Sequence, residues 1–297
     1  MRTDSTPNYS DVVSATGFLR PRASRSMASF QEHLATSHRI LALLGAGLSA
    51  SSGIPTFRGA GGVWRTHDAT QLATPTGFAA DPVLVWEFHL ERLEEMKNKG
   101  PNAAHRALSE LASKNEQFLA LTMNIDDLSE RAGHSAESLR HLHGRLDDLR
   151  CNMCDLHLSK TDSAAALEPL LQNDSSTPLS LGDIPRCPRG ECKDGLLRPG
   201  VVWFTEPLPQ ALLESIAEWI GDENDNSRRI DTMLVIGTSA LVYPATAYIE
   251  GARKRGARVA VVDIEQEDPS LLGLAEQDWY FQGDAATLVP VMLGYLP

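Results

Sequence analysis

The sequence of 297 residues has only four cysteines, fewer basic than acidic residues and no long hydrophobic segment. No apolar run approaches the roughly 20 residues that a membrane-spanning helix needs, so we expect no membrane partner. Lysine and arginine number 27 against 39 acidic residues, a formal net charge of −12. This argues against direct nucleic-acid binding, which normally needs a basic surface. All four cysteines fall in one stretch, so catalysis by a thiol elsewhere is excluded.

The first 26 residues are rich in serine, threonine and arginine and contain no lysine or glutamate. This composition leans toward an organelle transit peptide, and a disordered tail is the alternative. We therefore treat residues 1–28 as a tail or transit segment, and 29–297 as the functional unit. The expected location is mitochondrial or cytoplasmic, with the nucleus as a third option.

The fold prediction rests on four apolar runs. They cover residues 39–47, 118–127, 232–240 and 257–265, and each ends in glycine or polar residues. Such runs are typical of buried parallel strands. The segment 246–257 lies between the last two runs and predicts a crossover helix. Apolar strands that alternate with helices predict an α/β fold with a parallel sheet.

Two segments, 59–100 and 151–199, interrupt this alternation and predict a smaller lobe. The first contains a clear helix, with Asp81 as N-cap, Pro82 in its first turn and Gly100 at the C′ position. The second contains the cysteines and a segment rich in serine, aspartate and proline.

A glycine turn follows the first predicted strand. Gly45, Gly47 and Ala50 have the GxGxx(G/A) spacing of a dinucleotide-binding turn. Glycines there let the backbone approach a pyrophosphate, and the next helix N-terminus favours negative charge. The alternative is a tight turn that needs glycine only for packing.

The residues after this turn differ from the pattern expected of a simple dehydrogenase. Residues 53–55, Gly-Ile-Pro, end the helix early, and Phe57 and Arg58 follow on a glycine-rich loop as candidate ligand-covering groups. The acidic partner of the adenosine ribose is then best supplied by Asp263, at the end of the last predicted strand. A carboxylate there favours NAD over NADP, and the alternative is that Asp263 caps the next segment.

The cysteines form two close pairs, CNMC at 151–154 and CPRGEC at 187–192. Two such pairs predict a tetrahedral site of four thiolates that holds a structural zinc ion with Cys151, Cys154, Cys187 and Cys192. A redox function does not need the second pair, and disulfides are disfavoured in an intracellular-looking chain.

Seven motifs together resemble a known family. GAGLSASSGIPTFRG, MNIDDL, HLHG, the paired cysteines, GLLRPGVVWFTE, GTS and FQG occur in this order within residues 39–287. The set resembles the sirtuins, the NAD-dependent lysine deacylases, and GIPTFRGAGGVWR and GLLRPGVVWF are most similar to the class III desuccinylase and demalonylase branch.

This resemblance implies a Rossmann-like large lobe and a small zinc-binding and helical lobe. Their implied limits are 37–66, 101–147 and 198–297 for the large lobe, 67–100 for the helical module and 148–197 for the zinc module.

The resemblance also implies a reaction. The acyl oxygen of a modified lysine attacks C1′ of the nicotinamide ribose and nicotinamide leaves. A histidine then deprotonates a ribose hydroxyl, which attacks the imidate; free lysine and O-acyl-ADP-ribose result. His143, before Gly144, matches this base, and a neutral imidazole can take a proton at working pH. His141 is the alternative base, and either residue could be a structural histidine.

MNID, at 123–126, occupies the position of the family's QNID. By resemblance, Asn124 holds a water or a ribose hydroxyl and Asp126 binds the nicotinamide carboxamide. Met123 replaces the glutamine and cannot donate a hydrogen bond, which could cost ~1–3 kcal/mol.

The resemblance implies a wider set of residues that contact NAD. They are Gly45, Ala46, Gly47, Ser49, Ile54, Pro55, Thr56, Phe57, Arg58, Trp64, Met123, Asn124, Ile125, Asp126, Gly237, Thr238, Ser239, Asp263, Ile264, Glu265 and Ala285.

Two residues on one predicted helix imply which acyl groups the chain prefers. His89 and Arg92 occupy the positions of the Tyr and Arg that bind an acyl carboxylate in class III enzymes, which favours succinyl-, malonyl- or glutaryl-lysine over acetyl-lysine. The alternative is that Arg92 pairs with Glu95. The segment with Val202, Trp203 and Phe204 could pair with an extended substrate peptide, or be an ordinary buried strand.

The expected function is therefore NAD-dependent deacylation of proteins or peptides, by a monomer with one structural zinc ion. Protein mono-ADP-ribosyl transfer is the alternative activity at the same site. A weakly active NAD-binding module is a further alternative, supported only by Met123. A hydride-transferring dehydrogenase is disfavoured by the interrupted helix and the cysteine cluster.

Overall fold

The computed structural model describes residues 23–56, 63–172, 178–222, 225, 228–238, 245–265 and 273–295. The strands are β1 (Ile40–Leu44), β2 (Val63–Trp64), β3 (His67–Asp68), β4 (Phe118–Thr122), β5 (Leu139–His141), β6 (Gly144–Cys151), β7 (His157–Leu158), β8 (Leu197–Val201), β9 (Thr232–Ile236), β10 (Arg258–Asp263) and β11 (Trp279–Gln282). The helices are α1 (Met27–Leu34), α2 (Gly47–Ala50), α3 (Ala69–Leu72), α4 (Pro75–Ala80), α5 (Pro82–Lys97), α6 (Ala103–Lys114), α7 (Leu128–Arg131), the 3-10 turn η3 (Ala136–Ser138), α8 (Lys160–Leu171), α9 (Gln210–Ile220), α10 (Ala245–Lys254) and α11 (Ala285–Met292).

A parallel sheet forms the large lobe. Within the described residues its order is β11-β10-β9-β1-β4-β5, and every neighbouring pair is parallel. All residues of β1, β4 and β9 are buried, as continuous apolar runs predict for strands covered on both faces. The four predicted strands and the crossover helix α10 are confirmed.

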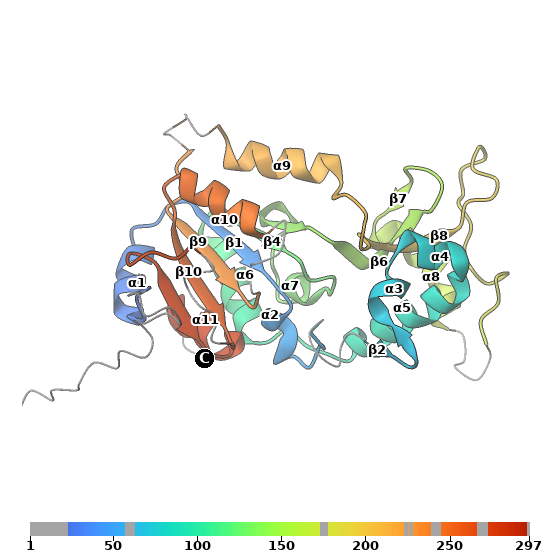
Figure 1. Ribbon diagram of the computed structural model, residues 1–297, viewed down its shortest axis with the longest axis horizontal. Coiled ribbons are helices and arrows are strands. Elements are labelled where there is room, and N and C mark those ends of the chain that lie inside the picture. The colour runs from blue at the N-terminus through green and yellow to red at the C-terminus, as the bar shows by residue number, and fades with distance from the viewer. Residues whose placement is uncertain are drawn as a thin grey trace, which may run out of the picture.

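Helices cover both faces of this sheet (Figure 1). Alternate strand residues pack with α9 and α10 on one face, and with α1, α6 and α11 on the other. This arrangement brings the carboxyl ends of the parallel strands to one edge, where ligands bind in folds of this type.

The smaller lobe lies beside the parallel sheet (Figure 1) and has its own core. A three-stranded antiparallel sheet, β7-β6-β8, packs with α3, α4, α5 and α8 around one apolar cluster. Both interrupting segments therefore contribute to one lobe. The predicted limits of the zinc module, 148 and 197, fall inside this sheet, because β6 begins at Gly144 and β8 ends at Val201.

Helix α5 begins as predicted and ends earlier. Asp81 accepts a hydrogen bond from the Leu84 N–H over 2.9 Å, and Pro82 is the first helical residue. The prediction of Gly100 at C′ is wrong, since the helix ends at Lys97 with Asn98 as C-cap. The guanidinium of Arg131 donates to carbonyl oxygens at this end, so a side chain rather than a glycine satisfies them.

None of the helices in the described part of the chain is long and apolar enough to cross a membrane.

Candidate active site

The two lobes meet at the turn that carries His143. Strand β5 ends at His141, and β6 begins at Gly144, so His143 lies between the strands rather than on the same strand as His141. The His143 carbonyl oxygen accepts a hydrogen bond from the Val202 N–H over 2.7 Å. Gly144 has a φ of +69°, and a Cβ there would lie 2.2 Å from the Gly200 carbonyl oxygen. The turn therefore requires glycine after the histidine.

The His143 ring has a defined tautomer. Its Nδ1 lies 2.9 Å from the main-chain oxygen of Met123, and a carbonyl oxygen can only accept, so Nδ1 carries the proton. Nε2 is then the basic nitrogen, and no residue in the described part of the chain forms a hydrogen bond with it. Burial lowers the pKa of His143, and the bond to Met123 offsets part of this effect. The ring is thus neutral at pH 7, as a general base requires.

The other histidine of the HLHG motif is in a different environment. His141 Nε2 lies 2.9 Å from Glu130 Oε1 and 3.4 Å from Arg145 Nη1, so contacts within the protein occupy this nitrogen in either tautomer. His141 therefore has no free basic Nε2, and His143 is the better candidate for the base.

Glycines of the predicted nucleotide turn pack against the end of β9. The Gly45 and Gly47 N–H groups donate to the carbonyl oxygens of Ile236 and Gly237, each over 2.9 Å. Cβ atoms at the two glycines would lie 2.6 and 2.7 Å from atoms of Gly237. The packing alternative thus accounts for both glycines, because their amide groups are already engaged. Helix α2 is only four residues long, as the Gly-Ile-Pro at 53–55 predicts.

Behind this turn is a buried polar network. Asn124 Nδ2 donates to the Gly45 carbonyl oxygen over 3.1 Å and to Ser49 Oγ over 3.2 Å. Ser49 Oγ donates to Asp126 Oδ2 over 2.8 Å, and Asp126 Oδ1 accepts from the Leu128 N–H over 3.1 Å. Burial raises the pKa of Asp126, against these hydrogen bonds. Asn124 therefore uses both amide hydrogens inside the protein and leaves Oδ1 for a ligand.

His105, which the sequence did not single out, fixes the direction of this network. The Asn102 N–H donates to His105 Nδ1, so Nε2 carries the ring proton, and it faces Ser49 Oγ at 3.3 Å. Burial lowers the pKa of His105 to about 4, so the ring is neutral at pH 7. Since Ser49 Oγ accepts hydrogen bonds from His105 and Asn124, its own O–H donates to Asp126.

Other predicted NAD contacts follow the same sheet edge. Asp263 ends β10, is 7% exposed and accepts the Glu265 N–H at Oδ1 over 3.0 Å, which is the capping geometry considered above. The other carboxylate oxygen of Asp263, Oδ2, forms no hydrogen bond within the described part of the chain. Ile264 is exposed, and Ala285 is the buried first residue of α11.

Trp64 lies apart from that edge. It packs in the small-lobe core, edge-on to Phe88 with ring centroids 5.3 Å apart. Three further predicted contacts, Phe57, Arg58 and Ser239, lie outside the described residues.

The two residues of the predicted acyl pair differ in burial, since His89 is in the core and Arg92 is partly exposed. His89 is 2% exposed, donates from Nδ1 to the Val85 carbonyl oxygen over 2.7 Å and accepts from Trp203 Nε1 at Nε2 over 3.5 Å. Burial lowers its pKa to about 4. His89 has no proton left for a substrate carboxylate, which corrects the expected role. Arg92 forms an ion pair with Glu95 over 2.9 Å, the alternative noted above.

The N–H groups of the segment predicted to pair with a substrate peptide form hydrogen bonds within the protein. The N–H groups of Val202, Trp203 and Phe204 donate to the His143 oxygen, to Glu206 Oε2 and to the Ala73 oxygen. Trp203 is 3% exposed, whereas the Phe204 side chain is about half exposed. These three N–H groups are therefore engaged within the protein, and pairing of this segment with a peptide stays a prediction.

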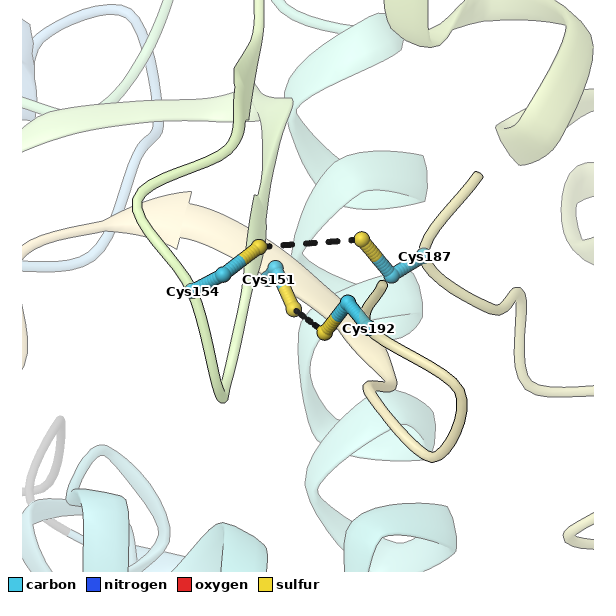
Figure 2. Close-up of side chains that lie close together, drawn as sticks. All are labelled: Cys151, Cys154, Cys187 and Cys192. Carbon is cyan, nitrogen blue, oxygen red and sulfur yellow. Dashed lines mark hydrogen bonds between the residues drawn. The ribbon is translucent and has the colours of Figure 1, made fainter. Parts of the chain in front are cut away.

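The four cysteines come together in the small lobe, from the end of β6, the turn that follows it and the loop before β8 (Figure 2). Their Sγ atoms all lie within 4.8 Å of one another, and two of the distances are 3.5 and 3.7 Å. A tetrahedron with Zn–S bonds of about 2.3 Å has sulfurs about 3.8 Å apart. A Cβ on Gly195 would lie 2.5 Å from Cys192 Sγ, so only glycine fits beside the cluster. The hydrogen bond with Cys151 raises the pKa of the Cys192 thiol to about 12, and a bound cation would reverse this effect. These residues fit one four-coordinate zinc ion with no open position.

Comparisons with known proteins agree on one family. The Sir2 family model matches residues 45–244. An NAD-dependent protein deacylase of Candida albicans is 40% identical over 91% of this chain and 97% of its own length. The NAD-dependent protein deacylase sirtuin-5, mitochondrial, of Danio rerio is 37% identical over 92% and 88%. A crystal structure of a Sir2 homologue in complex with NAD is 32% identical, with a TM-score of 0.73, and covers 92% of this chain and 95% of that chain.

Proposed function

Since the chain belongs to the Sir2 family, and its relatives are NAD-dependent protein deacylases, we propose that His143 is the general base of NAD-dependent removal of acyl groups from lysine side chains. The observation that carries this role is the tautomer of His143. Its Nδ1–H is fixed by the Met123 carbonyl, and Nε2 is left to take a proton from a ribose hydroxyl of bound NAD.

Neighbouring groups would bind and orient NAD, which is a substrate of this reaction. Asn124 Oδ1 is the acceptor for a ribose hydroxyl, because its amide hydrogens are engaged by Gly45 and Ser49. The Asp126 carboxylate, oriented by Ser49, is the acceptor for the carboxamide of nicotinamide. The free oxygen of Asp263 suits the adenosine ribose.

The four cysteines would hold zinc as a brace for the small lobe. A site closed by four thiolates has no position for substrate, so zinc would supply structure and no chemistry to the reaction.

We further propose that the chain prefers acyl groups that end in a carboxylate, such as succinyl, malonyl and glutaryl. Support comes from the sirtuin-5 relatives and from Arg92, which is only 19% exposed and can exchange its Glu95 partner for a substrate carboxylate. With His89 engaged in the core, Arg92 would act without that second donor.

One experiment tests both proposals. Purified chain is incubated with NAD and a panel of acetyl-, malonyl-, succinyl- and glutaryl-lysine peptides, and the products are read by mass spectrometry. We expect free lysine peptide and O-acyl-ADP-ribose, formed fastest from the acidic acyl groups. Protein that gains ADP-ribose instead would establish the transferase alternative, and NADH formation would establish a dehydrogenase.

For location we propose the mitochondrion, because sirtuin-5 of Danio rerio and of Canis lupus familiaris carry that location in their names. Fusion of residues 1–26 to a fluorescent protein tests this proposal. Fluorescence that stays in the cytosol or nucleus contradicts a transit function for those residues.

A further inference from the structure

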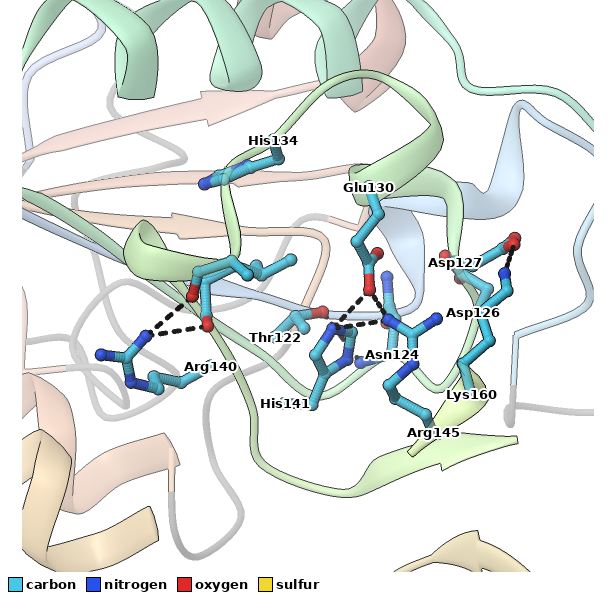
Figure 3. A network of polar contacts seen from close by, with 12 residues as sticks. Thr122, Asn124, Asp126, Asp127, Glu130, His134, Arg140, His141, Arg145 and Lys160 are labelled. Carbon is cyan, nitrogen blue, oxygen red and sulfur yellow. Dashed lines mark hydrogen bonds and ion pairs between the residues drawn. The ribbon is translucent and has the colours of Figure 1, made fainter. Parts of the chain in front are cut away.

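Residues 123–130 are attached to the turn of His143 at both ends. At one end, the Met123 carbonyl oxygen accepts the His143 Nδ1–H. At the other, the Glu130 carboxylate contacts His141 Nε2 over 2.9 Å and the Arg145 guanidinium (Figure 3). We call the second attachment the Glu130–Arg145 clamp. Between the two attachments lie Asn124 and Asp126, the proposed NAD contacts.

Arg145 is held in a geometry that only arginine can supply. Its Nε and Nη2 bind the two oxygens of Asp147 over 2.9 and 3.0 Å, while Nη1 reaches Glu130. Three nitrogen atoms of the planar guanidinium thus bind two carboxylates. The Arg145 side chain is 17% exposed and Glu130 is 26% exposed, so solvent screens the pair less than a surface ion pair.

The clamp belongs to a chain of alternating charges that joins the lobes. Lys160, the first residue of α8, contacts Asp147 over 2.9 Å and Asp127 over 3.1 Å. Asp127, the N-cap of α7, and Glu130 within α7 belong to the large lobe, whereas Asp147 on β6 and Lys160 on α8 belong to the small lobe. Arg145 joins Glu130 to Asp147 in this chain, two residues after the proposed base. A shift of α7 relative to β6 would therefore break several contacts together.

We propose that Arg145 is a positioning residue for NAD: through Glu130 it holds residues 123–130 at a fixed distance from His143, so that Asn124 and Asp126 face the substrate. This inference rests on the proposed deacylase function. Arg145 would act through Glu130, by way of the backbone between Asp126 and Glu130. If Arg145 instead served stability alone, its loss would leave NAD binding unchanged.

The test compares the wild type with Arg145→Met, Glu130→Gln, the double variant and the control Arg253→Met. Arg253 is 24% exposed and pairs with the buried Asp278 over 2.7 Å, on α10 in the large lobe. The control therefore also removes a half-buried arginine from a carboxylate, away from the proposed site. Each variant is measured for thermal stability, kcat, KM for NAD, inhibition by nicotinamide and NAD affinity by calorimetry.

We expect each single variant of the clamp to raise KM and Kd for NAD, and the nicotinamide concentration for half inhibition, by roughly tenfold, with a smaller effect on kcat. The double variant should be no worse than the singles, because the same contact is lost. Arg253→Met should lose thermal stability and keep all NAD parameters.

Two results would overturn the proposal: clamp variants that lose only stability, as the control does, or single effects that multiply in the double variant. Glu130→Gln preserves side-chain shape and keeps the test available if Arg145→Met does not fold. A wild type that binds NAD without releasing O-acyl-ADP-ribose would refute the deacylase function. Calorimetry alone would then decide the role of Arg145.

Discussion

The Nδ1 of His143 donates to the main-chain carbonyl oxygen of Met123 over 2.9 Å, and the Met123 side chain has no part in this bond. The orientation of the base therefore does not depend on which side chain stands at position 123. A methionine there removes a potential hydrogen bond to NAD without turning the imidazole away.

Substitutions at Met123 separate these two roles. Met123→Gln should raise kcat/KM for NAD roughly tenfold, because the amide supplies a polar contact that a thioether cannot. Met123→Leu should leave kcat/KM within about twofold, since it keeps the carbonyl and an apolar side chain of similar volume. Steady-state kinetics measure both, and inactivation by Met123→Leu would contradict this view of the site.

Position 144, next to the proposed base, should not tolerate a side chain. Gly144→Ala should lower the free energy of unfolding by about 3 kcal/mol and displace His143, because the new Cβ meets the Gly200 oxygen at a φ of +69°. Urea denaturation and kcat provide the measurements. Gly251→Ala, in helix α10 with no atom within 4 Å of its Cβ, is the control and should stabilise by up to about 1 kcal/mol. Equal stability of the two variants would count against the close approach.

The parts of the fold that could be predicted from sequence are those set by local pattern. Apolar runs that end in glycine or polar residues predicted β1, β4, β9 and β10, because strands covered on both faces need apolar residues throughout. The spacing of the cysteines likewise predicted their cluster, since the two members of each pair are close in sequence.

The predictions that failed required knowledge of which face of an element packs. His89 and Arg92 share helix α5, but the spacing of three residues cannot show that His89 faces the core. His105 and Arg145 were missed for a related reason. Their partners Ser49 and Glu130 are brought to them by the tertiary fold, and no local motif marks such pairs.

Zinc content is a direct test of the cysteine cluster. The purified chain should contain one zinc ion per molecule by elemental analysis, and Cys187→Ser should lose it together with thermal stability, because the small-lobe core includes these cysteines. Ser180→Ala, on the same loop region but not a ligand, should keep the metal. A zinc-free wild type with full stability would refute the structural role.

Acid should destabilise the fold through buried histidines. Burial lowers the pKa of His89, His105 and His134 to about 4, whereas in the unfolded chain they titrate near 6.5. Between these values the unfolded state binds more protons, so this stability is complete above pH 6.5 and is lost as pH falls toward 4. Each histidine contributes at most about 3 kcal/mol to the free energy of unfolding. Urea unfolding at pH 7, 6 and 5 measures the decline, and His89→Phe should reduce its slope; an unchanged slope would contradict the prediction for His89.

Arg92 decides the proposed preference for acidic acyl groups. Arg92→Met should reduce kcat/KM for succinyl-lysine peptide by about 100-fold while leaving acetyl-lysine within a few-fold, because only the succinyl carboxylate loses a charged hydrogen bond. Glu95→Gln is the complementary variant. It removes the present partner of Arg92 and should raise the succinyl rate, since the guanidinium no longer has to exchange an ion pair for the substrate. Kinetics with matched succinyl and acetyl peptides measure both variants. If Arg92→Met affects the two peptides equally, Arg92 serves only its pair with Glu95, and selectivity must come from another residue.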